Sequence, residues 1–446
     1  MRSFFNCLKQ NYIKGSSHNN RFFLQFYSSR VSINYRRFSS TTNILNTNTN
    51  NQINQKFNNI KKMSEIEQSL KPLFDEINNL KPKFIERLTK AVAIPSVSGD
   101  ESLRPKVVEM AHFLVSELKE LGADDVRLRD LGIQPPPVTT PDLKLPPIVL
   151  AKFGSDPAKK TVLIYGHYDV QPALKEDGWA TDPFTLVEVD NKLYGRGSTD
   201  DKGPVIGWLN SLEAHKKLGL DLPVNLVCCF EGMEESGSLG LDDLIAEEAE
   251  GYFKGVDTVC ISDNYWLGTK KPVLTYGLRG CNYYQISVKG PGADLHSGIF
   301  GGVIHEPMTD LIKVMGELVD VNGNILIPGV NEMVAPVTEK EKSLYDDIEF
   351  DVDELNAASG SSTAIYQDKK DILMHRWRYP SLSLHGIEGA FYGGGAKTVI
   401  PAKVIGKFSI RTVPDMDSKK LDKYVFDYIN GKFAELNSKN TLVVEL

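Results

Sequence analysis

The sequence predicts an α/β fold, in which a mostly parallel sheet carries helices on both faces and a smaller α+β domain is inserted after it. Two observations predict it. In the middle of the chain, short apolar runs alternate with helical segments, as in "TVLIYGHYDV", "GPVIGWLNSLEAHKKLG" and "VNLVCCFEG". From about residue 274, paired strand-like runs with interposed helices take over, a pattern typical of a split α+β unit.

The elements follow one another in a definite order along the 446 residues, a length that suits two or three domains. Apolar residues three and four apart predict helices from about 65 to 120, before the proline-rich loop "GIQPPPVTTPDLKLPP". The alternating strands and helices come next, through "LDDLIAEEAEG" and "DTVCISD". The last part contains the strand "CNYYQISVKG", a helix near "HEPMTDLIKVMGELV", the strand "VIGKFSIRT", the helix "SKKLDKYVFDYINGKFAEL" and the strand "TLVVEL". We expect domains over residues 65–273 and 274–446.

The first 62 residues differ from the rest in charge. They hold ten Lys and Arg and no Asp or Glu, the first acid being Glu65. A basic leader rich in Ser, Asn and Arg is typical of a mitochondrial transit peptide, and an Asn-rich disordered tail is the alternative. Both place residues 1–62 outside the fold. We expect mitochondrial localisation from the leader, and cytosolic localisation if translation starts at Met63.

Composition excludes several classes of function. No apolar run approaches the length needed to cross a bilayer, so we expect no membrane partner. Beyond the leader, the remaining 41 Lys and Arg face 58 Asp and Glu, which argues against nucleic acid as a partner. Five cysteines, two of them adjacent in an apolar run, predict reduced core thiols rather than a disulfide framework.

Side chains of the metal-ligating type follow four of the predicted strands. Loops at the carboxyl ends of parallel strands are where such sheets place chemistry, and side chains two apart on a strand share a face. One imidazole with several carboxylates suits a pair of Zn²⁺ or Mn²⁺ ions bridged by a shared aspartate. The candidates are His167 with Asp169, Asp200 with Asp201, Glu234 with Glu235, and Asp263.

Each candidate also has a purely structural explanation. His167 suits a core histidine beside a carboxylate, and Asp200 with Asp201 suits a helix cap. Glu234 and Glu235 suit a solvated charge pair. The coincidence of ligand types at four strand ends favours the metal site.

The motifs "GHYDVQP", "LYGRGSTDDKGP", "EGMEESGS", "ISDNYW" and "GADLHSGIFGG" together resemble the co-catalytic metallopeptidase family of carnosinases, aminoacylases and bacterial dipeptidases, from about residue 75 onwards. The resemblance implies two divalent metal ions, Zn or Mn, in a catalytic domain followed by a lid and dimerisation domain. It implies that His167 and Asp263 hold one metal, that Asp200 bridges both and that Glu235 holds the other. It also implies a cis peptide bond between the adjacent aspartates of "TDDK".

The same resemblance assigns roles to side chains that do not bind metal. Asp169 would orient His167, and Glu234 would be the general base. Adjacent glutamates suit this chemistry, because one can bind metal while its neighbour takes the proton of the attacking water.

The second domain supplies substrate-binding candidates by the same resemblance. His296 would bind substrate and stabilise the oxyanion in the partner subunit's active site, which implies a homodimer. Thr398 and Arg411 would contact substrate, and a guanidinium can grip the carboxylate of a dipeptide by two hydrogen bonds. The alternatives are a loop histidine among glycines and a surface arginine.

We therefore expect a metallodipeptidase acting on small peptides, such as a broad-specificity Cys-Gly dipeptidase. One alternative is an N-acyl-amino-acid deacylase of the same family. Family members continue beyond the point that matches Leu446, with a last metal-binding histidine, so the other alternative is a truncated, non-catalytic product that lacks the C-terminal part of the catalytic domain.

Overall fold

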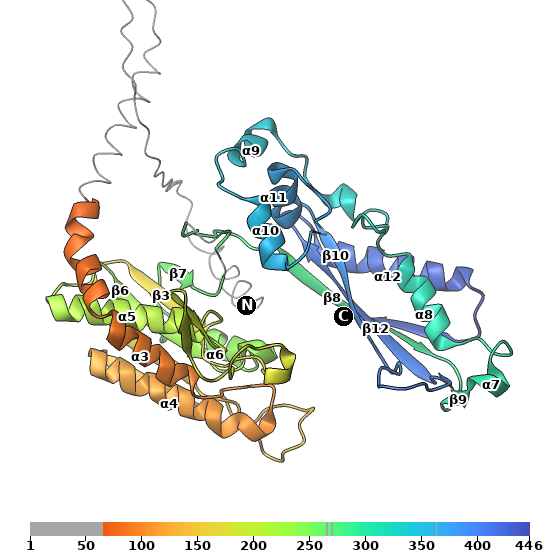
Figure 1. Cartoon of the computed structure of the whole chain (residues 1–446), viewed down its shortest axis with the longest axis horizontal. Coiled ribbons are helices and arrows are strands. Elements are labelled where there is room, and N and C mark those ends of the chain that lie inside the picture. Colours follow the sequence, from red (N-terminus) through yellow and green to blue (C-terminus); the bar gives the residue numbers. More distant parts are fainter. Residues whose placement is uncertain (1–65, 265, 269–270, 363) are drawn as a thin grey trace, which may run out of the picture. The chain divides into compact units, whose positions relative to one another are not determined.

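The computed structural model describes residues 66–446 apart from 265, 269–270 and 363, so the predicted leader lies outside the described residues (Figure 1). The chain divides into two compact units, Met1–Asn264 and Tyr265–Leu446. The pattern of paired strands in the sequence placed this boundary at residues 273 and 274. The structure places the division earlier, after Asn264. Residues 271–279 contain no strand or helix, so the pattern of paired strands starts only at Gly280, beyond the division.

The first unit is built on a five-stranded sheet in the order β1-β2-β6-β3-β7. Its strands are β1 Asp125–Arg129, β2 Ile148–Phe153, β3 Thr161–His167, β6 Asn225–Glu231 and β7 Thr258–Ile261. β3 pairs in parallel with both β6 and β7, whereas β2 runs antiparallel to β1 and β6. The α/β prediction is confirmed, with a sheet that is mixed because β2 is reversed.

Helices cover both faces of this sheet. On one face, α3 Lys81–Val92, α4 Arg104–Leu121 and α5 Lys202–Leu218 pack on alternate side chains of the strands, such as Ile164 and Cys228 (Figure 1). On the other face, α6 Leu241–Glu248 packs on the intervening side chains, such as Tyr165 and Cys229. Every residue of β6 is buried, which explains its continuous apolar run. The sequence period of two thus sorts the strand side chains into two cores.

Local signals in the sequence set the helix ends. Proline occupies the first turn of α3 and α4, where its missing N–H leaves no hydrogen bond unmade. α4 ends at Gly122 with φ +91°, a left-handed conformation that glycine adopts without steric cost. The minor elements of this unit are η1 Glu101–Leu103, η2 Lys175–Asp177, β4 Val187–Val189, β5 Lys192–Tyr194 and η3 Glu234–Ser236.

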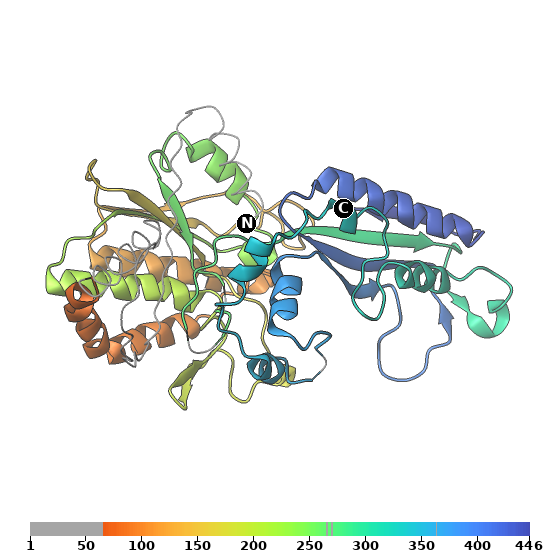
Figure 2. The ribbon, with the colours of Figure 1, turned by 90° about the horizontal axis from the view of Figure 1, so that it is seen from above.

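The second unit contains a four-stranded antiparallel sheet in the order β10-β12-β8-β13. Its strands are β8 Gly280–Lys289, β10 Ser381–Glu388, β12 Lys403–Thr412 and β13 Thr441–Glu445. Two helices, α8 Pro307–Gly316 and α12 Ser418–Glu435, share one apolar core with the sheet, and α12 runs along it in Figure 2. This is the α+β arrangement that the sequence predicted.

The remaining elements of the second unit are short. They are β9 Leu295–His296, α7 Ser297–Phe300, η4 Asn331–Met333, α9 Glu339–Leu344, α10 Val352–Ser359, α11 Lys369–Trp377 and β11 Val399–Ile400. β9 and β11 pair with each other and form a separate two-stranded sheet. Among the described residues, no helix combines the length and the apolar character that a membrane span requires. Cys228 and Cys229 are buried free thiols, as expected.

Candidate metal centre

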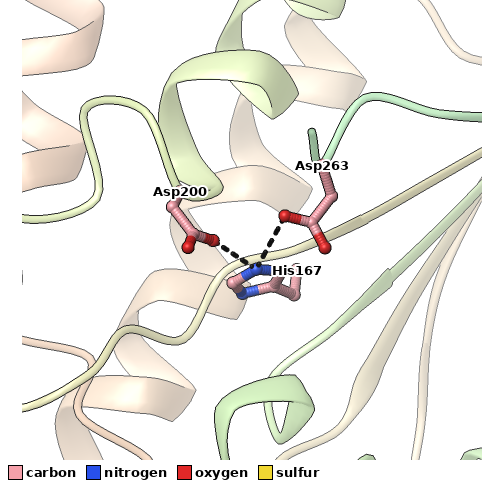
Figure 3. Close-up of side chains that lie close together, drawn as sticks. All are labelled: His167, Asp200 and Asp263. Carbon is pink, nitrogen blue, oxygen red and sulfur yellow. Dashed lines mark hydrogen bonds and ion pairs between the residues drawn. The ribbon is translucent and has the colours of Figure 1, made fainter. Parts of the chain in front are cut away.

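Three side chains of metal-ligating type converge at one edge of the first sheet (Figure 3). His167 is the last residue of β3, and Asp263 follows the neighbouring strand β7. Asp200 lies in the turn before α5. The carboxyl ends of two parallel strands and the start of a helix therefore bring together residues that are far apart in sequence.

The distances suit a cation between these side chains. The Nε2 atom of His167 lies 3.0 Å from Oδ1 of Asp200 and 3.8 Å from Oδ1 of Asp263. One ligand atom from each residue lies within 4.8 Å of the other two. An imidazole nitrogen with two carboxylate oxygens is a donor set that Zn²⁺ and Mn²⁺ accept.

Asp169 contacts the ring of His167 at Nδ1, the nitrogen that does not face Asp200 and Asp263. The Nδ1 atom lies 3.1 Å from the carbonyl oxygen of Asp169 and 3.3 Å from its carboxylate, and both side chains are fully buried. Because both neighbours of Nδ1 are acceptors, this nitrogen carries the hydrogen. When a metal replaces the proton on Nε2, the lone pair of this nitrogen is directed toward the space beside Asp200 and Asp263.

The hydrogen bond and the charge of His167 favour the ionised form of Asp200. The hydrogen bond from His167 lowers the pKa of Asp200. Burial by itself lowers the pKa of His167, but hydrogen bonds to Asp169, Asp200 and Asp263 outweigh burial and raise that pKa well above its ordinary value. A metal ion must displace the proton from Nε2, so affinity for metal should increase with pH.

The two glutamates stand on the short helix η3 that follows β6. The carboxylate of Asp169 accepts hydrogen bonds from the backbone N–H groups of Glu234 at 3.2 Å and Glu235 at 3.1 Å. The side chain of Glu235 accepts a hydrogen bond from Nε2 of Gln171 at 2.8 Å. Within the described residues, the convergent ligand group contains neither glutamate.

Burial changes the proton affinity of both glutamates. It raises the pKa of Glu234, and the negative charges of Asp263 and Glu235 raise it further, against the effect of His167. Burial and the charge of Asp200 likewise raise the pKa of Glu235. Both carboxyl groups therefore lie within electrostatic range of the ligand group.

The three residues of "DDK" each support the region of the metal centre in a different way. The peptide bond between Asp200 and Asp201 is cis, as the family resemblance implied. Asp201 is fully buried and accepts a hydrogen bond from the backbone N–H of His167 at 3.1 Å, and burial raises its pKa to about 8. Lys202 is also fully buried, and its ammonium donates to the carbonyls of Ala91 and Ile94 at the end of α3.

The sequence reasoning did not identify the supporting roles of Lys202, Gln171 or Trp208. The indole Nε1–H of Trp208 donates to the hydroxyl of Ser262 at 2.9 Å, next to Asp263. The position of Lys202 beside two candidate ligands was the available signal for that residue. Nothing in the local sequence indicated the contact between Trp208 and Ser262, because it joins residues far apart in the chain.

In the second unit, the structure brings His296 and Thr398 together. The Nδ1 atom of His296 accepts a hydrogen bond from the N–H of Gly298 at 3.0 Å, so its Nε2–H donates to the hydroxyl oxygen of Thr398 at 3.2 Å. Arg411 lies on β12, opposite Ser381 of β10. In the described parts of the chain, no hydrogen bond or ion pair joins Arg411 to His296 or Thr398.

The chain is similar to several known proteins. Residues 163–435 match the sequence model of peptidase family M20/M25/M40. The chain is 74% identical over 379 residues to a Cys-Gly metallodipeptidase of Candida albicans, covering 84% of this chain and 78% of the relative. It is 47% identical over 382 residues to the human Beta-Ala-His dipeptidase, covering 84% of this chain and 74% of the relative. The crystal structure of human carnosine dipeptidase 1 superposes with a TM-score of 0.79 at 46% identity, covering 84% of this chain and 79% of that one.

Proposed function

Since the chain belongs to peptidase family M20/M25/M40 and is a metal-dependent dipeptidase, we propose that it hydrolyses Cys-Gly and related small dipeptides at the centre formed by His167, Asp200 and Asp263. The observation that carries the proposal is the convergence of these three ligand atoms, together with 74% identity to a Cys-Gly metallodipeptidase. The relatives described above are dipeptidases, so the deacylase alternative is not favoured.

The metal ions are divalent, and we assign them as Zn²⁺ or Mn²⁺. His167 and Asp263 would hold one ion, Asp200 would contribute to both, and Glu235 would serve the second. When bound, such ions lower the pKa of water and polarise the scissile carbonyl. The four protein ligands supply negative charge and orientation, and the hydrogen bond from His167 to Asp169 keeps the imidazole in the metal-binding tautomer.

Glu234 is the general base in this proposal. Its carboxyl group is outside the convergent ligand group, and burial raises its pKa, which makes it a stronger proton acceptor than an exposed glutamate. The N–H of Glu234 is bound to Asp169, which fixes the position of its backbone relative to His167. The proton taken by Glu234 would then pass to the leaving amine.

His296, Thr398 and Arg411 bind the substrate. The Nε2–H of His296 donates to Thr398, which leaves the hydroxyl hydrogen of Thr398 free to donate to the oxyanion that develops from the polarised carbonyl. Arg411 suits the terminal carboxylate of a dipeptide. Hydrolysis of Cys-Gly, measured beside that of an N-acetyl amino acid, tests the substrate class: faster turnover of the acylated amino acid would refute it.

Arg411→Lys should raise KM for Cys-Gly by roughly tenfold or more, because an ammonium cannot reproduce the planar two-bond grip of a guanidinium on a carboxylate. A dipeptide with an amidated C-terminus should be insensitive to the substitution. Steady-state kinetics on both substrates provides the measurement, and equal effects on acid and amide would refute the assignment.

Two further proposals concern assembly and localisation. The role of His296 in a partner subunit's site implies a homodimer, which light scattering should detect as twice the chain mass. Residues 1–62 should direct a fused fluorescent protein to mitochondria, whereas a fusion that starts at Met63 should remain in the cytosol. A monomer in solution, or diffuse fluorescence from both fusions, would contradict the respective proposal.

A further inference from the structure

Two buried polar side chains, Glu231 and Tyr165, meet the half-buried Ser238 behind the turn that carries Glu234 and Glu235. Glu231, the last residue of β6, is 1% exposed. One of its carboxylate oxygens accepts hydrogen bonds from the hydroxyl of Tyr165, which is 2% exposed, and from the hydroxyl of Ser238 at 2.8 Å. Tyr165 belongs to β3, two residues before His167, whereas Ser238 closes the turn. The carboxylate of Glu231 therefore joins the turn to the strand that ends in the metal ligand.

The turn itself is short and tightly closed. The carbonyl of Met233 accepts hydrogen bonds from the N–H groups of Ser236 at 3.0 Å and Ser238 at 2.7 Å, and the carbonyl of Glu234 accepts one from Gly237. Gly237 has φ +93° and Ser238 has φ +53°. Serine is not favoured in the left-handed region, and two hydrogen bonds stabilise Ser238 there: its N–H donates to Met233 and its hydroxyl donates to Glu231.

Hydrogen bonds from outside the turn hold it at its start, in its middle and at its end. At its start, the carboxylate of Asp169 accepts the N–H groups of Glu234 and Glu235. At its end, Glu231 accepts the hydroxyl of Ser238. In the middle, the hydroxyl of Ser236 is hydrogen-bonded to that of Ser98 at 2.9 Å, and Nε2 of Gln171 donates to the carbonyl of Glu235 at 3.3 Å. With these contacts made, the backbone on which Glu234 and Glu235 stand is fixed relative to β3.

Burial of a carboxylate at this position is unfavourable in free energy. Removing an ionised group from water is unfavourable unless hydrogen bonds compensate, and an apolar residue could fill the same space at lower cost. Two hydroxyl groups converge on one oxygen of Glu231, so the arrangement compensates burial and at the same time specifies a geometry.

We propose that Glu231, acting through Ser238, is a positioning residue that fixes the turn bearing Glu234 and Glu235 against the metal centre. The proposal rests on the proposed function, because its catalytic consequence depends on the role of Glu234. It assigns a task to the first glutamate of "EGMEESGS", which the sequence reasoning did not single out.

Two matched substitutions separate positioning from general stability. Ser238→Ala removes the hydrogen bond that reaches the turn, and Tyr165→Phe removes a hydrogen bond to the same oxygen that comes from the strand. In hydrogen exchange followed by mass spectrometry, Ser238→Ala should accelerate exchange of the amides of Glu234 and Glu235 about fivefold. Tyr165→Phe should leave that exchange at the wild-type rate while lowering the unfolding temperature.

Two variants of Glu231 and the kinetics complete the test. Glu231→Gln keeps an acceptor oxygen, so the amides of Glu234 and Glu235 should exchange at close to the wild-type rate. Glu231→Met has no acceptor, so these amides should exchange as fast as in Ser238→Ala. In steady-state hydrolysis of Cys-Gly, Ser238→Ala should lower kcat on the order of tenfold with little change in KM. The proposal would be overturned if Ser238→Ala and Tyr165→Phe accelerated exchange equally. It would also be overturned if neither Ser238→Ala nor Glu231→Met accelerated exchange. Exchange does not require turnover, so absence of hydrolysis by the wild-type chain would count against the proposed function alone.

Discussion

Glu234→Gln should lower kcat for Cys-Gly hydrolysis on the order of a hundredfold or more while leaving the affinity for divalent metal nearly unchanged. The amide is almost isosteric with the carboxyl group but cannot accept the proton of the attacking water. Because the side chain of Glu234 is outside the convergent ligand group, its loss leaves His167, Asp200 and Asp263 in place. The backbone N–H that binds Asp169 is also kept.

The matched control for this substitution is Glu332→Gln, since Glu332 is an exposed glutamate of the second unit. It removes the same charge far along the chain from the metal centre and should keep wild-type kcat. Metal affinity is measured by calorimetry on all three proteins. If Glu234→Gln retains wild-type kcat, the general base has been misassigned.

His167→Ala should lower the affinity of the centre for divalent metal by at least about a hundredfold, and hydrolysis should be lost as a consequence. His167 is the one imidazole of the ligand group, and both aspartates approach its Nε2 atom. Without the ring, two carboxylates remain around a vacant space. Two carboxylates bind Zn²⁺ less well than a set containing imidazole.

The control for His167→Ala is His112→Ala, which replaces an exposed histidine within α4 by a good helix former. Asp169→Asn should give an intermediate loss of metal affinity, about 10- to 100-fold, because it disturbs the tautomer of His167 without removing a ligand. Titration of Mn²⁺ and Zn²⁺ into each metal-free protein provides the measurement. Unchanged affinity in His167→Ala would place the metal elsewhere.

The sequence contained the information needed to predict the strand ends. His167 and Asp169 are two positions apart at the end of an apolar run, and the structure places them in contact. The change from alternating helices and strands to paired strands predicted two kinds of architecture, which the structure confirms. These features depend on local periodicity, which a single sequence contains.

Other features depend on contacts that local sequence does not encode. A buried apolar run such as that of β2 carries no information on strand direction, so its reversal could not be predicted. Lys202 donates to carbonyls in and just after the last turn of α3, more than a hundred positions earlier in the chain. The contact between Glu231 and Ser238 is closer in sequence, but it requires the left-handed conformation at Ser238, which serine gives no reason to expect.

The central claim is that the centre at the ends of β3 and β7 holds the divalent metal on which dipeptide hydrolysis depends. The most direct test removes metal from the purified chain with a chelator and restores Mn²⁺ or Zn²⁺ stepwise, while Cys-Gly hydrolysis and metal occupancy are measured together. We predict no hydrolysis without metal, a rise in rate that follows occupancy, and no such rise in His167→Ala. Undiminished hydrolysis in the metal-free protein, or a rate restored by metal in His167→Ala as fully as in the wild type, would contradict the account.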